Sequence, residues 1–175
     1  RAYEPSARVP FLVQAHPDYG IKRTSVVDYP ATHADIMPTI LDIAGIPIPE
    51  TVDGISLWPL MRGERPARWR KYIHIEHAPY HHALTDGKEK YIWNPSDGKE
   101  QFFDLQNDPQ EKHNLINNES YKQRIEKWRK WLVKELSWRP EGFVKNGRLV
   151  AGCKYEAIMP GTNKFGLEKI GAHDL

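Results

Sequence analysis

The sequence predicts an α/β fold, of α+β type within this chain. It comprises the end of a large mixed α/β sheet domain, followed by a small antiparallel sheet packed by a C-terminal helix. Three observations support this prediction. A nearly continuous apolar run and a capped amphipathic helix stand in the first third of the chain. Short segments that alternate apolar and polar residues begin at residue 72. After residue 120, apolar side chains recur at helical spacing.

The composition indicates a globular protein. The 175 residues are 39% hydrophobic and 27% charged, which is typical of a folded domain. The net charge of +2 is too small to indicate nucleic-acid binding by itself, and no apolar run approaches the roughly 20 residues of a membrane span. The single cysteine, Cys153, excludes an internal disulfide, so cysteine usage does not indicate whether the cellular compartment is oxidising or reducing.

Residues 1–61 are expected to form the α/β part. Residues 8–14 are an apolar run that suits a strand buried on both faces, and residues 25–28 are predicted to form a second short strand. An amphipathic helix follows, with Thr32 or Asp35 as its N-cap. Gly45 supplies the left-handed residue that ends it. An open parallel sheet needs several more strands than this segment supplies.

Residues 62–71 are predicted to form a linker that follows a short helical turn at residues 56–61. The linker holds five basic residues and one acidic residue, Glu64. A nucleic-acid contact is one interpretation of this charge. Gly63 and Pro66 argue against an ordered basic helix, so a solvated linker is favoured.

Residues 72–140 are predicted to form the small sheet and its helix. Period-two patterns give three or four antiparallel strands, at residues 72–77, 83–85, 89–94 and 101–105. Asp86-Gly87 is a hairpin turn signal between two of them. The expected connections are therefore tight turns.

A long helix is predicted after residue 119, with Ser120 as its cap. Its apolar residues fall on one face, which is expected to pack across the sheet: Tyr121, Ile125, Trp128, Leu132 and Leu136. A membrane-surface helix is the alternative, because tryptophans and lysines occur together here. Residues 141–175 are expected to be an extended C-terminal tail, of which residues 147–175 wrap the surface or are partly disordered.

Three stretches in chain order carry motifs of a known family. Residues 3–13 read YEPSARVPFLV, residues 33–64 contain HADIMPTILDIAGI followed by DGISLWPLMRGE, and residues 102–115 read FFDLQNDPQEKHNL. The chain thereby resembles the C-terminal portion of the type I, arylsulfatase-like sulfatases of the alkaline-phosphatase superfamily. The resemblance implies that residues 1–61 end the sulfatase α/β catalytic domain and that residues 72–140 form its small C-terminal subdomain.

The resemblance implies a sulfuric ester hydrolase. In the family, a formylglycine made from the Cys or Ser of a C/S-x-P-S-R motif supplies the attacking oxygen, and a calcium ion helps to neutralise the sulfate. This sequence contains neither that motif nor the paired aspartates of the metal site. No catalytic or metal-binding residue is therefore assigned, and Cys153 is predicted to be a bystander thiol. Because the chain begins with Arg1, we expect a fragment of a longer bacterial-type enzyme that is inactive alone.

Histidines cluster around Tyr80, at positions 74, 77, 81 and 82. His77, Tyr80, His81 and His82 are predicted to lie in the first inter-strand loop of the subdomain. The resemblance implies that such loops face the active site, where these groups would hydrogen-bond a polar substrate such as a sulfated sugar or aryl group. An ordinary polar loop explains them equally well. A zinc site is disfavoured, because His81 and His82, if adjacent on a strand, would point to opposite faces.

Two other functions stay open. A phosphonate or phosphate ester hydrolase of the same superfamily would share these motifs. A non-catalytic module that binds an acidic polymer would use the basic residues of segment 62–71 together with Lys122, Arg129 and Lys130. A homo-oligomer is also possible, because strands and an apolar helix face would expose surface meant for the rest of a larger protein.

Overall fold

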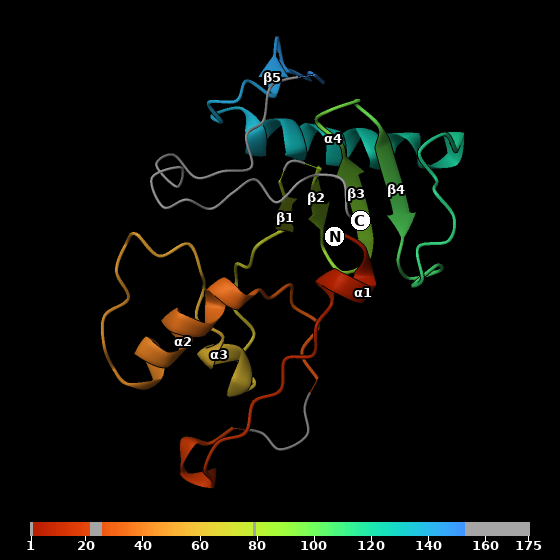
Figure 1. The fold of residues 1–175 in the computed structure, drawn as a ribbon. Helices are drawn as coiled ribbons and strands as arrows, with labels where there is room; N and C mark the ends of the chain where they lie inside the picture. The colour runs from red at the N-terminus through yellow and green to blue at the C-terminus, as the bar shows by residue number, and fades with distance from the viewer. Residues whose placement is uncertain (1, 22–25, 79, 153–175) are drawn as a thin grey trace, which may run out of the picture.

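The structure is a computed structural model that describes residues 2–21, 26–78 and 80–152. Its centre is a four-stranded antiparallel sheet with the long helix α4 across it (Figure 1). A second group, the helices α2 and α3, lies to one side of the sheet in the yellow and orange part of the chain. The described part is therefore α+β, as the sequence predicts.

The sheet runs in the order β1-β2-β3-β4, so each strand pairs with its neighbour in sequence. The strands are β1 Ile73–His77, β2 His81–Thr85, β3 Glu89–Trp93 and β4 Glu100–Asp104. The predicted strands are confirmed, although β2 begins two residues earlier than its pattern. The turn before β3 contains Gly87 with φ of +83°, a backbone conformation that glycine adopts without strain.

Helix α4, Lys122–Leu136, covers one face of this sheet. Its buried side chains are those predicted from the helical spacing: Ile125, Trp128, Leu132 and Leu136. They pack against Leu84, Tyr91, Trp93 and Phe102 from the three strands β2 to β4. Each such side chain contributes about 1.5–3 kcal/mol through its removal from water, so this cluster is the main core.

The predicted N-cap of α4, Ser120, is wrong, because Ser120 lies within a 3₁₀ turn, Glu119–Tyr121, that precedes the helix. Asn118 caps this turn by accepting a hydrogen bond from the backbone N–H of Ser120 at 3.0 Å. Asparagine and serine cap helices about equally well. The choice between Asn118 and Ser120 therefore depends on the turn that comes before them.

The predicted strand at residues 8–14 is absent. The short helix α1, Glu4–Ala7, is followed by irregular backbone up to a 3₁₀ turn at Pro17–Tyr19, and Leu12 is 93% exposed. The second predicted strand is also absent over residues 26–28, while residue 25 lies outside the described part. A strand of a parallel sheet is stable only beside partner strands, and no described segment pairs with these residues.

The predicted helix of this region is present. Helix α2 spans Ile36–Ile43 after a 3₁₀ turn at His33–Asp35, and Gly45 follows it with φ of +67°. Helix α3, Trp58–Met61, lies beside it and confirms the predicted short turn.

The predicted linker is not simply solvated. Arg70, near its end, donates to both carboxylate oxygens of the fully buried Asp35, at 2.6 and 2.5 Å. Trp69 donates from its indole N–H to the Pro30 carbonyl at 2.8 Å. The end of the linker is therefore fixed against the α2 region.

The start of the predicted tail belongs to the core instead of the surface. Phe143 is fully buried beside α4, and the strands β5 Val144–Lys145 and β6 Arg148–Leu149 form a hairpin. Asn146 and Gly147 both have positive φ, as the two-residue Asn-Gly turn of a hairpin requires. The remaining tail, including Cys153, lies outside the described residues. Within the described part, no helix has the length and apolar character to cross a membrane.

Candidate functional site

The sheet divides the predicted site residues between its two faces. His77 pairs with His81 across β1 and β2, and Glu76 pairs with His82 one position further on. Adjacent residues of a strand point to opposite faces, so His82 lies on the α4 face and His81 on the other. The predicted loop location is wrong, because His77, His81 and His82 belong to the strands and only residues 78–80 connect them.

On the face opposite α4, aromatic rings stack at the β1–β2 end. The His77 ring lies 5.1 Å from that of Tyr80 and 5.1 Å from that of His81, and Tyr80 is 42% exposed. The backbone N–H of Ala2 donates to His81 Nε2 at 3.1 Å. Burial, followed by the neighbouring His77, lowers the pKa of His81. The three side chains therefore offer two imidazoles and a phenol at the edge of the sheet.

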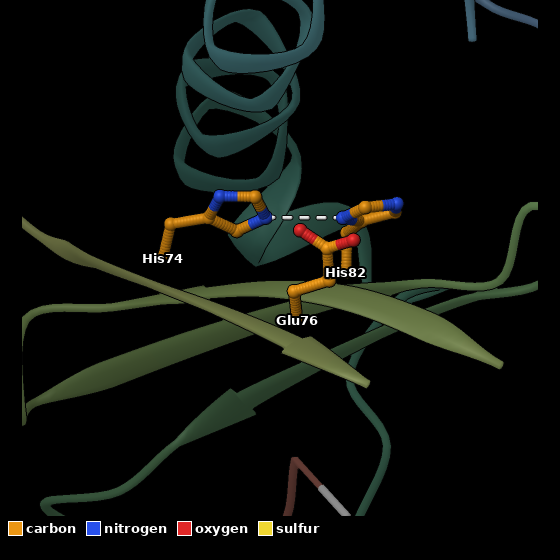
Figure 2. Close-up of side chains that lie close together, drawn as sticks. All are labelled: His74, Glu76 and His82. Atoms are coloured by element: carbon orange, nitrogen blue, oxygen red, sulfur yellow. Dashed lines mark hydrogen bonds between the residues drawn. The ribbon is translucent and has the colours of Figure 1, made fainter. Parts of the chain in front are cut away.

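On the α4 face, His74, Glu76 and His82 lie together, as Figure 2 shows. His74 Nε2 is 3.1 Å from His82 Nδ1, and the two rings are stacked at 5.2 Å between centroids. One ligand atom from each of the three side chains lies within 4.8 Å of the others. We call these three residues the His-Glu-His cluster.

The surroundings of this cluster are partly apolar and partly charged. The fully buried His82 ring lies against Trp93 and Phe143, with centroids 6.1 and 5.0 Å away. Burial is the main cause that lowers the pKa of His82 to about 4, and His74 adds to it. Burial also lowers the pKa of His74, although Glu135 and Glu76 oppose the shift. Both imidazoles are therefore neutral near pH 7.

Two charged side chains, those of Glu135 and Arg139, lie at the edge of the cluster. Glu135, from the last turn of α4, lies 3.7 Å from His74 Nδ1 and accepts a hydrogen bond from the Tyr72 hydroxyl at 3.1 Å. Burial and then Glu135 raise the pKa of Tyr72 to about 12, so this phenol stays protonated. Arg139 donates to Glu76 at 2.9 Å. The cluster is thus connected to the end of α4 by one ion pair, Glu76–Arg139, and by the contact of His74 with Glu135.

Sequence reasoning missed the pairing of His74 and Glu76 with His82. The signal was present in part, since two polar residues two positions apart on a strand share one face. Whether His74 and Glu76 contact His82 depends on the β1–β2 register. The predicted loop at residues 77–82 would have given a different register.

A second group of charges has a structural function. Lys90 is fully buried on the face opposite α4, with its Nζ 2.8 Å from Glu4 and 2.8 Å from Glu111. Glu111 also accepts from the backbone N–H of Glu4 at 2.6 Å. Two carboxylates thus compensate one buried ammonium, and together they anchor α1 to the sheet.

Calcium, implied by the resemblance, does not fit the described residues. Calcium prefers six to eight oxygen ligands, and the His-Glu-His cluster offers two nitrogens and one carboxylate. In the described part of the chain it is the one convergent group of three metal-ligand side chains. No catalytic step of this chain is therefore derived through calcium.

Comparison with known sequences matches this chain to sulfatases. The sequence model of the family "N-sulphoglucosamine sulphohydrolase, C-terminal" matches residues 1–137. An arylsulfatase of Clostridium perfringens is 45% identical over 157 residues, which cover 86% of this chain and 32% of that protein. The chain thus spans about a third of the length of this relative.

Solved structures share the fold. The structure of "a 2-O GAG sulfatase" matches with a TM-score of 0.61 and 26% identity, over 75% of this chain and 30% of that one. A phosphonate monoester hydrolase from Silicibacter pomeroyi matches with a TM-score of 0.57 and 26% identity, over 67% of this chain and 27% of that one.

Proposed function

From the premise that the chain belongs to the sulfatase family whose C-terminal model it matches, we propose that it serves an enzyme that hydrolyses sulfate esters. The match of the family model to residues 1–137 is the observation that carries this proposal. The 45% identity to an arylsulfatase supports it.

We propose that this chain does not catalyse the reaction alone. Sulfate-ester hydrolysis needs a nucleophile, a group that neutralises the sulfate oxygens and an acid for the leaving group. Among the described residues, the one convergent group of three metal-ligand side chains is the His-Glu-His cluster, which is not an oxygen-rich cation site. The relatives are about three times longer, so a preceding part of the polypeptide would supply the formylglycine and calcium.

The contribution proposed for this chain is to shape the substrate pocket at the β1–β2 end. Tyr80 is exposed and its ring stacks on that of His77, whose other neighbour is the tilted ring of His81 on the face opposite α4. A phenol and two imidazoles can donate and accept hydrogen bonds with sugar hydroxyls. His82 is fully buried on the other face, so it is not included in this pocket.

The substrate class proposed is a sulfated sugar. Support comes from the structural relative described as a 2-O GAG sulfatase, at 26% identity. The polar, hydrogen-bonding character of Tyr80, His77 and His81 is compatible with hydroxyl-rich substrates. A simple aryl sulfate would use fewer of these groups.

The test is sulfate release by the longer polypeptide that carries this chain, compared with the 175-residue chain alone. A sulfated monosaccharide and an aryl sulfate are offered separately. The proposal expects sulfate release by the longer polypeptide and none by the chain alone. Absence of sulfate release from both esters, with a folded enzyme whose formylglycine has been verified by mass spectrometry, would contradict it.

The second candidate is phosphonate ester hydrolysis. The observation in its favour is the fold shared with a phosphonate monoester hydrolase at a TM-score of 0.57. The fold alone does not select between these reactions, because one fold hosts several chemistries. The substrate preference of the longer polypeptide decides between them.

A further inference from the structure

We propose that His74, Glu76 and His82 form a zinc-binding site between the sheet and the last turn of α4. The three side chains converge from two neighbouring strands, as Figure 2 shows. The site is independent of the sulfate-ester chemistry and of the calcium that the family relationship implies. Its occupant is a single Zn²⁺ ion.

The spacing of the two imidazole nitrogens fits a shared zinc ion. Zinc binds histidine nitrogen at about 2.0–2.1 Å in tetrahedral geometry, which separates two such nitrogens by about 3.3 Å. His74 Nε2 and His82 Nδ1 are 3.1 Å apart. Small rotations of the two rings would therefore place one ion between them. Glu76 is directly opposite His82 across the strand pair and brings a carboxylate to the same point.

The neighbouring groups orient the first of these ligands. A metal-binding histidine usually donates its other ring N–H to a carboxylate, which fixes the ring. Glu135 lies 3.7 Å from His74 Nδ1, the nitrogen that faces away from His82. The Tyr72 hydroxyl in turn donates to Glu135. In this arrangement Nε2 of His74 is directed into the cluster and Nδ1 toward Glu135.

Aromatic packing orients the second histidine. Trp93 and Phe143 lie on the buried His82 ring, so its rotation is restricted. Restricted ligands lose little conformational entropy when they bind a metal.

The charge balance also suits a divalent cation. Around the cluster lie three carboxylates, from Glu76, Glu135 and Glu141, and one guanidinium, from Arg139. These groups leave two negative charges, which one Zn²⁺ balances. Arg139 competes for Glu76, because it donates to both of its carboxylate oxygens, at 3.3 and 2.9 Å, but it also donates to Glu141 at 2.8 Å. Glu76 can therefore give one oxygen to zinc while Arg139 keeps its bond to Glu141.

The donor set selects zinc over the alkaline-earth ions. Two imidazoles and a carboxylate are ligands typical of zinc, whereas calcium and magnesium prefer oxygen alone. Three protein ligands leave a fourth position open, which a water molecule would fill.

The test is titration of the full 175-residue chain with zinc alone, followed by calorimetry. The expected result is one zinc per chain. Glu76→Gln and His74→Asn are each expected to weaken the zinc affinity by at least about tenfold, because removal of a group that merely orients a ligand already costs that much. His113→Ala is the matched control, since His113 is an exposed histidine of the same subdomain. It should leave the affinity unchanged.

Two results would overturn the proposal. One is absence of zinc binding to the wild-type chain, which would leave a direct His74–His82 hydrogen bond as the whole explanation of the 3.1 Å contact. The other is zinc binding that Glu76→Gln and His113→Ala leave equally unchanged. If a variant does not fold, the visible absorption spectrum of Co²⁺ bound to the wild-type chain tests the site instead. A tetrahedral site of nitrogen and oxygen ligands gives intense visible bands, whereas an unstructured surface site does not, and absence of these bands would overturn the proposal.

Discussion

Asp35 shows how one buried carboxylate fixes three separated segments. Its oxygens accept from the backbone N–H groups of Thr32 and Ile55, both at 2.8 Å, and from Arg70. A buried charge is tolerated only when its hydrogen-bonding capacity is satisfied in this way. The sequence predicts the capping position of Asp35, but not Arg70, because the partner lies 35 residues away.

The first prediction concerns this ion pair. Arg70→Met leaves the buried carboxylate without its cation, so we expect a loss of about 3–5 kcal/mol in the free energy of unfolding. Urea unfolding of the 175-residue chain measures it. Arg68→Met is the control, because Arg68 is exposed in the same segment and should change stability by less than about 0.5 kcal/mol. Equal effects of the two substitutions would contradict the account.

The second prediction concerns the pH dependence of the same group. Burial alone would raise the pKa of Asp35, but Arg70 and the N–H groups of Ile55 and Thr32 outweigh it and hold the pKa below the ordinary 3.8. A lowered carboxyl pKa gives stability that is fully present above 3.8 and is lost as the pH falls through the folded-state value.

Asp35→Asn is therefore expected to be less stable than the wild type near neutral pH, and the difference should shrink as the pH falls below 3.8. Unfolding by urea at a series of pH values measures it. A difference that stays constant or grows in acid would show that the carboxylate charge is not what stabilises this region.

The third prediction tests the pocket at the β1–β2 end. Tyr80→Phe removes one exposed hydroxyl and preserves the ring that stacks on His77. If the hydroxyl binds the substrate, kcat/KM for a sulfated sugar falls by roughly three- to tenfold, the value of one neutral hydrogen bond. Steady-state kinetics of the longer polypeptide measures it, with His113→Ala as the control. An unchanged kcat/KM would remove Tyr80 from the pocket.

At the scale of elements, the strands and α4 could be predicted because their signals are local. Period-two alternation and the Asp86-Gly87 turn specify a hairpin without knowledge of distant residues. The strand expected at residues 8–14 failed for the opposite reason, since a strand depends on partners that its own sequence does not reveal. The same contrast holds for the candidate site. The sequence shows that several histidines are close together along the chain, but the β1–β2 register decides which of them meet on the same face of the sheet.

The fourth prediction concerns the packing of α4. Trp128 is fully buried, and its indole N–H donates to Glu89 at 2.6 Å. Trp128→Ala is expected to cost about 3–5 kcal/mol, because it leaves a cavity and removes one of the hydrogen bonds that Glu89 accepts, while Arg124 still binds that carboxylate. Thermal and urea unfolding measure the loss. Lys130→Ala, on the exposed face of the same helix, should be nearly neutral; a comparable loss there would mean that α4 does not pack through its apolar face.

At the scale of the whole molecule, large apolar side chains are left exposed in two segments. They stand in the irregular segment after α1 and on α2: Val9, Phe11, Leu12, Val13, Ile36, Met37 and Ile40. Extended apolar exposure of this kind marks an interaction surface. We expect the preceding part of the sulfatase to cover it, and a homo-oligomer formed through it stays a prediction.

The binding-module alternative loses part of its support at this scale. Several cations that it needs are engaged within the chain. Arg70 binds Asp35, Arg129 binds Glu100 at 2.5 Å, and Arg62 binds Glu64 at 2.5 Å. Paired cations contribute little to attraction of an acidic polymer. The absence of a nucleic-acid partner remains a prediction.

The fifth prediction tests the central claim, that this chain belongs to a sulfate-ester hydrolase. The measurement is kcat/KM of the longer polypeptide for an aryl sulfate and for the matching aryl phosphonate monoester, under one set of conditions. The account predicts a higher value for the sulfate. A higher value for the phosphonate, with little or no sulfate release, would contradict it and assign the protein to the phosphonate hydrolases that share its fold.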